Sequence, residues 1–145
     1  GLQLAGVAGA WGFGILQDKT GPKPALTLSL LLWIAVCVAA AYCTSKTFFY
    51  AIGAAAGVAL GAFQSGGRAV VALFTPAGKG GEYFGFWGFF SKLAGVLGQP
   101  VFGLLAAWLG YRAAILANAG FFFLGLLVLL PLSLRPGAIS PIRAD

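Results

Sequence analysis

The sequence predicts an all-α protein that lies in a membrane. Of its 145 residues, 60% are hydrophobic and only 8% are charged, whereas a soluble domain carries about 25% charged residues. The mean hydropathy is +0.95. Apolar runs recur along the chain and are separated by short segments that contain Gly, Pro, Lys or Arg, which is the pattern of bilayer-crossing helices and their loops. We therefore predict five transmembrane helices, with the lipid bilayer as a partner.

The five apolar segments differ in completeness. The first covers residues 1–16 and rises about 24 Å as a helix, which is short of the hydrocarbon core of about 30 Å. We therefore expect residues 1–145 to be an incomplete C-terminal part of a longer protein, whose missing N-terminal helices are its partners. The predicted spans are residues 1–16, 25–43, 48–74, 82–108 and 113–134, with a basic tail at 135–145.

The basic residues indicate the side of the membrane on which each loop lies. Lys46 and Arg112 are the basic residues of the second and fourth loops, whereas the first loop, the third loop and the tail hold five. The positive-inside rule then places the C-terminus in the cytoplasm, and the protein in the inner membrane if it is bacterial. The charges are scattered singly, so we expect no nucleic-acid partner. The five residues are Lys19, Lys23, Lys79, Arg135 and Arg143.

The composition offers little for catalysis or metal binding. There is no His, so the usual triads and His-based metal sites are absent. Cys37 and Cys43 are six residues apart in one apolar segment and form no paired ligand motif. The acids Asp18, Glu82 and Asp145 are too scattered for a paired-carboxylate site. We predict no catalytic residue, no metal, no cofactor and no enzymatic activity.

Polar side chains are concentrated in the third and fourth spans. The second and fifth spans are almost entirely apolar, with Asn118 as the main polar side chain of the fifth. Polar groups inside a bilayer face a bundle interior or a water-filled cavity. The third and fourth spans are therefore predicted to be inner helices and the second and fifth outer ones. The polar residues that decide this are Gln64, Ser65, Arg68, Ser91, Lys92 and Gln99.

A regular stripe of small and polar residues runs along the third span. Its members recur every three or four residues, so they share one face of a helix. Small residues at this spacing let two membrane helices pack closely, and we predict this role for the glycines. Direct contact with a substrate is the alternative. The stripe consists of Gly53, Gly57, Gly61, Gln64 and Arg68.

Two basic residues lie inside predicted spans. Arg68 precedes Pro76 by eight residues, about 12 Å along a helix. It either pairs with Asp18, the one acid of the first loop, or binds an anionic group of a substrate, and we favour the pairing. Lys92 follows Glu82 by ten residues, about 15 Å, which is near the midplane. Its partner is a substrate carboxylate or phosphate or an acid of the missing helices, unless the side chain snorkels along its own helix.

The fourth span contains two further candidates for conformational roles. Glu82 begins the span, where the helix dipole favours a carboxylate. The alternative role is a gate contact on the cytoplasmic side, either with Lys79 or with a loop of the missing part. Pro100, after Gly98 and Gln99, removes a backbone hydrogen bond and predicts a kink.

The first loop resembles the signature loop of the major facilitator superfamily of transporters. It fits the pattern GxLxDxxGxKxxL, and Lys19 occupies the basic position after the acid. The resemblance implies a loop that stabilises one conformation on the cytoplasmic side, with Asp18 paired to Arg68 as a latch. The matched residues are Gly14, Leu16, Asp18, Gly21, Lys23 and Leu26.

Later motifs are similar to the autophagy-related vacuolar effluxer branch of this superfamily. They are the run from Gly53 to Arg68, Pro76 with Glu82–Phe86, Gly98–Gly103, and Gly110–Ile115. The chain departs from that branch at Gly67, Ala69, Trp87 and Gln99.

The resemblance implies a twelve-helix fold in which the five spans are the eighth to the twelfth. It also implies a secondary active transporter in which two six-helix halves rock about a central site. The substrate would be a small metabolite, such as an amino acid moving outward. Gln64, Arg68, Lys92 and Gln99 would line its path, with Glu82 and Pro100 at the gates. The competing hypothesis is a non-transporting membrane scaffold or helix-packing subunit.

Overall fold

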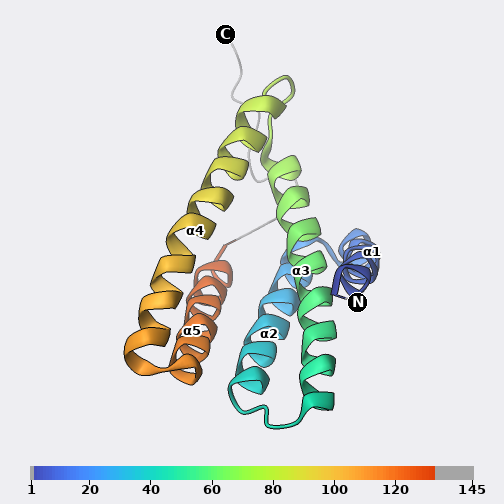
Figure 1. The fold of residues 1–145 in the computed structure, drawn as a ribbon. Helices are drawn as coiled ribbons and strands as arrows, with labels where there is room; N and C mark the ends of the chain where they lie inside the picture. Colours follow the sequence, from blue (N-terminus) through green and yellow to red (C-terminus); the bar gives the residue numbers. More distant parts are fainter. Residues whose placement is uncertain (1, 133–145) are drawn as a thin grey trace.

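The computed structural model describes residues 2–132, and this part of the chain folds into five α-helices without a β-strand (Figure 1). The prediction of an all-α protein with five helices is confirmed. The predicted tail at 135–145, with Arg135 and Arg143, lies outside the described residues, as do the last residues of the fifth predicted span. The helices are α1 (Leu2–Thr20), α2 (Pro22–Ala41), α3 (Lys46–Phe74), α4 (Gly80–Leu109) and α5 (Tyr111–Leu129).

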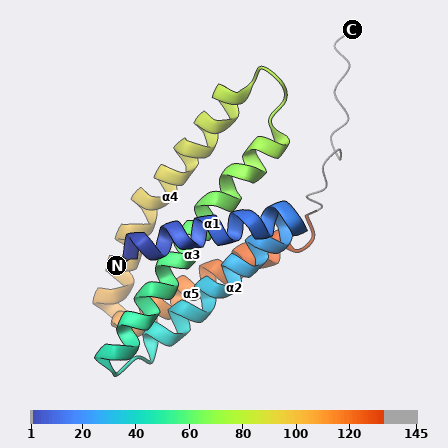
Figure 2. The ribbon, with the colours of Figure 1, turned by 90° about the vertical axis from the view of Figure 1, so that its right-hand side faces the viewer.

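Four of these helices, α2 to α5, are long and apolar enough to cross a membrane. In Figure 1 they run up and down the view, whereas α1 is seen nearly end-on. Figure 2 shows α1 from the side, where it crosses over α3. The first predicted span therefore runs across the direction of its neighbours.

Glycines with a positive φ separate two pairs of helices. Gly21 (φ +88°) is the one residue between α1 and α2, and Gly110 (φ +84°) is the one residue between α4 and α5. A residue without a Cβ adopts this backbone conformation at little cost. We predicted a loop over residues 17–24, but α1 continues to Thr20, whose hydroxyl donates to the Leu16 carbonyl (2.8 Å).

The packed part of the molecule consists of α1 on α3 and of α2 against both α3 and α5. Trp33 of α2 stacks on Phe122 of α5 with 5.2 Å between the ring centroids. At one end of the same helix pair, the Lys23 ammonium donates to the Leu130 carbonyl (2.6 Å). A cation is favoured at the C-terminal end of a helix, where backbone carbonyls lack intrahelical partners.

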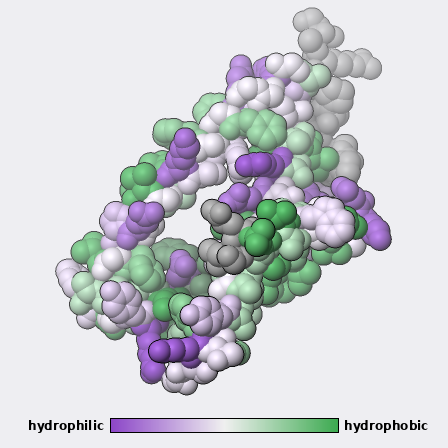
Figure 3. Space-filling view, turned by 45° about the vertical axis from the view of Figure 1, so that its right-hand side comes forward, coloured by the Kyte–Doolittle hydropathy of each residue, from purple (hydrophilic) through white to green (hydrophobic). Residues whose placement is uncertain are grey.

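Helix α4 stands apart from this packing. It has no buried residue, lies along α5, and has its smallest contact with α3 (Figure 1). It continues as an α-helix through Pro100. Figure 3 shows a face with broad apolar areas in green and separate hydrophilic spots in purple. The assignment of α4 as an inner helix stays a prediction, because none of its residues is buried within residues 2–132.

Candidate functional site

The crossing of α1 over α3 is made at glycines. A Cβ on Gly61 would overlap the carbonyl oxygen of Gly6 and lie 2.8 Å from the amide nitrogen of Ala10. A Cβ on Gly9 would overlap the backbone of Val58. The α1 backbone thus lies directly on that of α3, because neither glycine has a side chain that would hold the two helices apart.

The predicted stripe on α3 has different surroundings along its length. Gly57 is buried, and its carbonyl oxygen lies 3.4 Å from the Cβ position of Gly6. A Cβ on Gly53 would meet nothing within 4 Å. Gln64 and Arg68, at the other end, are exposed. Helix α1 therefore covers the middle of the stripe and leaves its polar end open.

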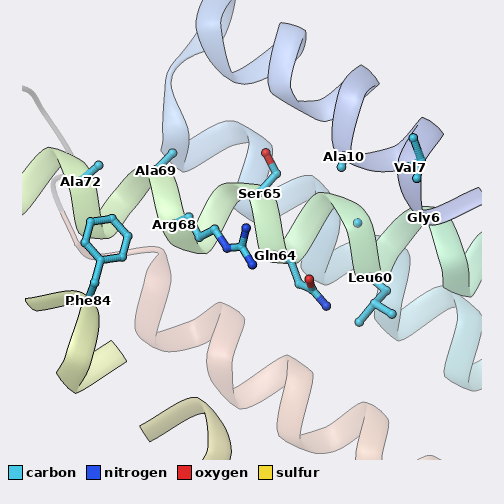
Figure 4. A pocket seen from close by; sticks show the side chains of 11 residues that line it. Gly6, Val7, Ala10, Leu60, Gln64, Ser65, Arg68, Ala69, Ala72 and Phe84 are labelled. Atoms are coloured by element: carbon cyan, nitrogen blue, oxygen red, sulfur yellow. The ribbon is translucent and has the colours of Figure 1, made fainter. Parts of the chain in front are cut away.

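This polar end lines a cavity of about 850 Å³ beside the α1–α3 crossing. In Figure 4, Gln64 and Arg68 extend from the same side of α3, and Ser65 points toward α1. Arg68 is the charged residue among the described residues that line this space. The lining consists of Gly6, Val7, Ala10, Leu60, Gly61, Gln64, Ser65, Arg68, Ala69, Ala72 and Phe84.

The Arg68 guanidinium lies over the indole of Trp87, 5.9 Å from its centroid. The same indole approaches α3 at Gly67, where a Cβ would be 3.4 Å from its ring nitrogen. Trp87 and Phe84 are three residues apart and thus share the face of α4 that meets α3. Asp18 is an exposed residue in the last turn of α1, and its pairing with Arg68 stays a prediction.

The other predicted path residues lie outside this cavity. Lys92 and Gln99 are seven residues apart on one face of α4, and both are exposed. Glu82 and Pro100, the predicted gate residues, are exposed on the same helix. The structure therefore brings Gln64 and Arg68 together and leaves the four residues of α4 apart from them. Their roles in a path or a gate stay predictions.

A second, smaller cavity of about 390 Å³ lies between α4 and α5. Its lining is apolar except for Asn118, whose side chain is also next to that of Cys37 on α2. Gly98 lines this space, but Gln99 and Pro100 do not. Residues 2–132 hold no group of three or more His, Cys, Asp or Glu residues placed to bind a metal ion.

The residues of the predicted conformational loop lie at the junction of α1 and α2. Gly14, Asp18 and Lys19 belong to α1, Gly21 is the break, and Lys23 belongs to the first turn of α2. The contact of Lys23 with α5 was not predicted, because no local pattern relates residues so far apart. Trp87 was noted only as a departure from the effluxer branch, and its contact with Arg68 was not predicted. The close packing of α1 on α3 could have been predicted, since the three-residue spacing of Gly6 and Gly9 places them on one face of α1.

Comparison with known proteins assigns the family. Residues 2–143 match the Major Facilitator Superfamily, which is nearly the whole chain. The chain therefore belongs to this superfamily of membrane transporters, and it is an integral protein of the lipid bilayer. Transporters of this superfamily generally move solutes and do not catalyse reactions.

One relative is the "Uncharacterized MFS-type transporter YxiO" of Bacillus subtilis (strain 168). It is 24% identical to the chain over 118 residues, which are 81% of this chain and 28% of that protein. The chain thus spans less than a third of the length of this relative. No solved structure matches it.

Proposed function

We propose that the chain is the C-terminal part of a secondary active transporter that moves a small metabolite by alternating access. The observation that carries this proposal is the cavity beside α3, whose lining includes Gln64 and Arg68. Both residues belong to α3, a helix that is long and apolar enough to span the membrane. Inserting an Arg at mid-bilayer costs about 2.5–3.5 kcal/mol on insertion scales, so such residues mark substrate or ion pathways. An Arg that lines a cavity inside a membrane span is therefore expected in a transport path.

The open face of α4 supports the proposal that further helices complete the path. Lys92 and Gln99 are exposed there, on a helix that has no buried residue. In alternating access, the two halves of a transporter meet at a site near the midplane. The missing half of this protein would lie against α4, with Glu82 and Pro100 near the moving contact. The same proposal includes a cell-membrane location, a cytoplasmic C-terminus, and a loop with Asp18 that stabilises one state.

The substrate class proposed from the resemblance is an amino acid that moves outward. The motifs that carry it are those shared with the autophagy-related vacuolar effluxer branch, from Gly53 to Arg68 and around Glu82–Phe86.

The test is flux through the whole protein in proteoliposomes. A set of labelled amino acids and other small metabolites identifies a substrate, and Lys92→Ala is then compared with Lys46→Ala, which removes a lysine at the start of α3. We expect Lys92→Ala to lower flux by about tenfold or more, or about 1.4 kcal/mol, at an unchanged protein level in the membrane. Lys46→Ala should retain flux.

The competing scaffold hypothesis predicts a different outcome. If the protein only packs against other helices, Lys92→Ala and Arg68→Ala will lower its level in the membrane, and no solute will cross.

The transport proposal makes one further prediction. Residues 1–145 alone should show no flux, because half of the path is absent. Flux through residues 1–145 alone would refute the proposal that the path needs both halves.

A further inference from the structure

We propose that the cavity beside Arg68 binds the carboxylate or phosphate group of a small anionic solute, and that Trp87 is the residue that positions the Arg68 guanidinium. This inference rests on the proposed transport function and names the head group that its site recognises, which an amino acid would supply as its carboxylate. It departs from the pairing with Asp18 that the sequence favoured. The reason is that the structure places the guanidinium over Trp87 and in the lining of the cavity.

The charge of the cavity selects the ligand. Arg68 contributes a positive charge, and none of the other described residues in the lining is charged. Gln64 precedes Arg68 by one helical turn and extends from the same side of α3 (Figure 4). A guanidinium presents several N–H donors in one plane, which match the two oxygens of a carboxylate or phosphate. A cationic solute would be repelled by this positive charge, which no acidic residue of the described lining compensates.

Trp87 holds the guanidinium while leaving its donors available. Arginine is attracted to the electron-rich face of an indole. Its N–H groups lie in the plane of the guanidinium, so a cation–π contact does not use them as a salt bridge does. The indole also packs against α3 at Gly67, where a Cβ would lie at an ordinary van der Waals distance of 3.4 Å from the indole nitrogen. Trp87 thus orients Arg68 without neutralising it.

The remaining lining describes the body of the solute. Val7, Leu60 and Phe84 give the cavity apolar walls. Its volume of about 850 Å³ falls within the range of about 300–1,000 Å³ that is typical of small-molecule sites. The expected ligand is an amphipathic anion, with its charged group at Arg68 and its apolar part against these walls.

The test is binding to the whole protein in lipid nanodiscs, measured by equilibrium dialysis. Four probes share one butyl chain and differ in the head group: pentanoate, butyl phosphate, butanol and butylammonium. We expect at least one of the two anions to bind and the alcohol and ammonium probes not to bind. Whichever anion binds more tightly identifies the head group as carboxylate or phosphate.

Substitutions at Arg68 locate the binding. Arg68→Gln should weaken binding of the anion by about tenfold or more, as expected when a charged hydrogen-bonding partner is removed. Arg68→Lys, which keeps the charge and the fold, should give an intermediate loss because Lys lacks the planar fork. Arg112→Gln removes an exposed arginine in the first turn of α5 and is the matched control. It should bind like the unmodified protein.

Trp87 is tested by comparing an apolar with an aromatic replacement. Trp87→Leu should weaken binding of the anion by about three- to fivefold, and Trp87→Phe should restore most of it. Trp108→Leu is the matched control, since Trp108 is 83% exposed on the same helix. A merely structural role for Trp87 would lower the thermal stability of Trp87→Leu without changing the preference for anion over alcohol.

Two results would overturn the inference. One is that butanol binds as well as the anions. The other is that no anion binds the unmodified protein, as expected if a carboxylate from another helix already occupies Arg68. Dialysis measures binding without transport, so the transport function and the anion site at Arg68 can be rejected independently. Binding without flux would reject the transport function, and flux without anion binding would reject this site.

Discussion

Helices α3 and α4 are the two longest of the five described helices, with 29 and 30 residues, and both combine an apolar surface with several glycines and at least one basic residue. Their surroundings differ. Helix α3 is covered by α1 and α2, whereas α4 has no buried residue and meets α3 at few points. The buried residues of α3 are Ile52, Gly57, Ala59, Ala62 and Gly66.

Five of the seven glycines of α4 also follow one face of their helix, at intervals of three or four residues and multiples of these, together with Lys92 and Gln99. A Cβ on any of them would meet nothing within 4 Å, in contrast to Gly61 on α3. A stripe of small residues therefore shows that another helix can pack closely against it. It does not show whether that other helix lies within residues 2–132. The glycines are Gly81, Gly85, Gly88, Gly95 and Gly103.

Gly61→Ala tests the close packing of α1 on α3 and should have the largest effect on stability. The added methyl group would overlap the backbone of Gly6, which cannot rotate away as a side chain can. We expect a loss of about 3 kcal/mol, the upper part of the usual range for overpacking, measured by thermal unfolding in detergent. Gly53→Ala is the matched control, because its methyl group enters open space. Equal stability of the two variants would contradict the close α1–α3 crossing.

Trp33→Leu tests whether α2 and α5 belong to the packed side. It removes the stacked pair with Phe122, and the expected loss is about 1.5 kcal/mol or less. Trp11→Leu serves as the control, since Trp11 is 74% exposed. A Trp33→Leu protein that unfolds at the same temperature as the control would show that the α2–α5 contact adds nothing to stability.

Lys23→Ala tests the end of the same helix pair. Losing the hydrogen bond to the Leu130 carbonyl should destabilise the last turn of α5 by about 1 kcal/mol. Amide hydrogen exchange in that turn should then be about fivefold faster. Lys19→Ala, which changes an exposed lysine at the end of α1, should leave this exchange unchanged. Faster exchange in both variants would point to a general effect of charge.

Gly95→Ala tests the glycine-lined face of α4, which contacts nothing at this position, and should have the smallest effect. In residues 1–145 alone, the methyl group meets nothing, so the better helix propensity of Ala should stabilise the protein by up to about 1 kcal/mol. In the whole protein, the proposed missing half lies against α4, and the same substitution should destabilise it. A stabilising effect in both would argue that no helix packs closely at Gly95.

The sequence was sufficient for the features that depend on nearby residues. Composition and apolar runs predicted five helices in a membrane protein, because the bilayer demands long apolar segments whose backbone groups are satisfied internally. Gly21 and Gly110 fall within the breaks between the predicted spans, although the break at Gly21 is a single residue where a loop over 17–24 was expected. The motif resemblance reached the correct superfamily.

Tertiary structure alone decided which of the predicted site residues meet. Gln64 and Arg68 share a helix face by their spacing, but only the crossing of α1 over α3 at Gly61 makes that face part of a cavity. Spacing along α4 could not reveal that Trp87 would meet Arg68, or that Lys92 would lie elsewhere. Such contacts depend on the direction in which one helix crosses another. Periodicity determines which residues share a helix face, but the neighbouring helix determines what that face meets.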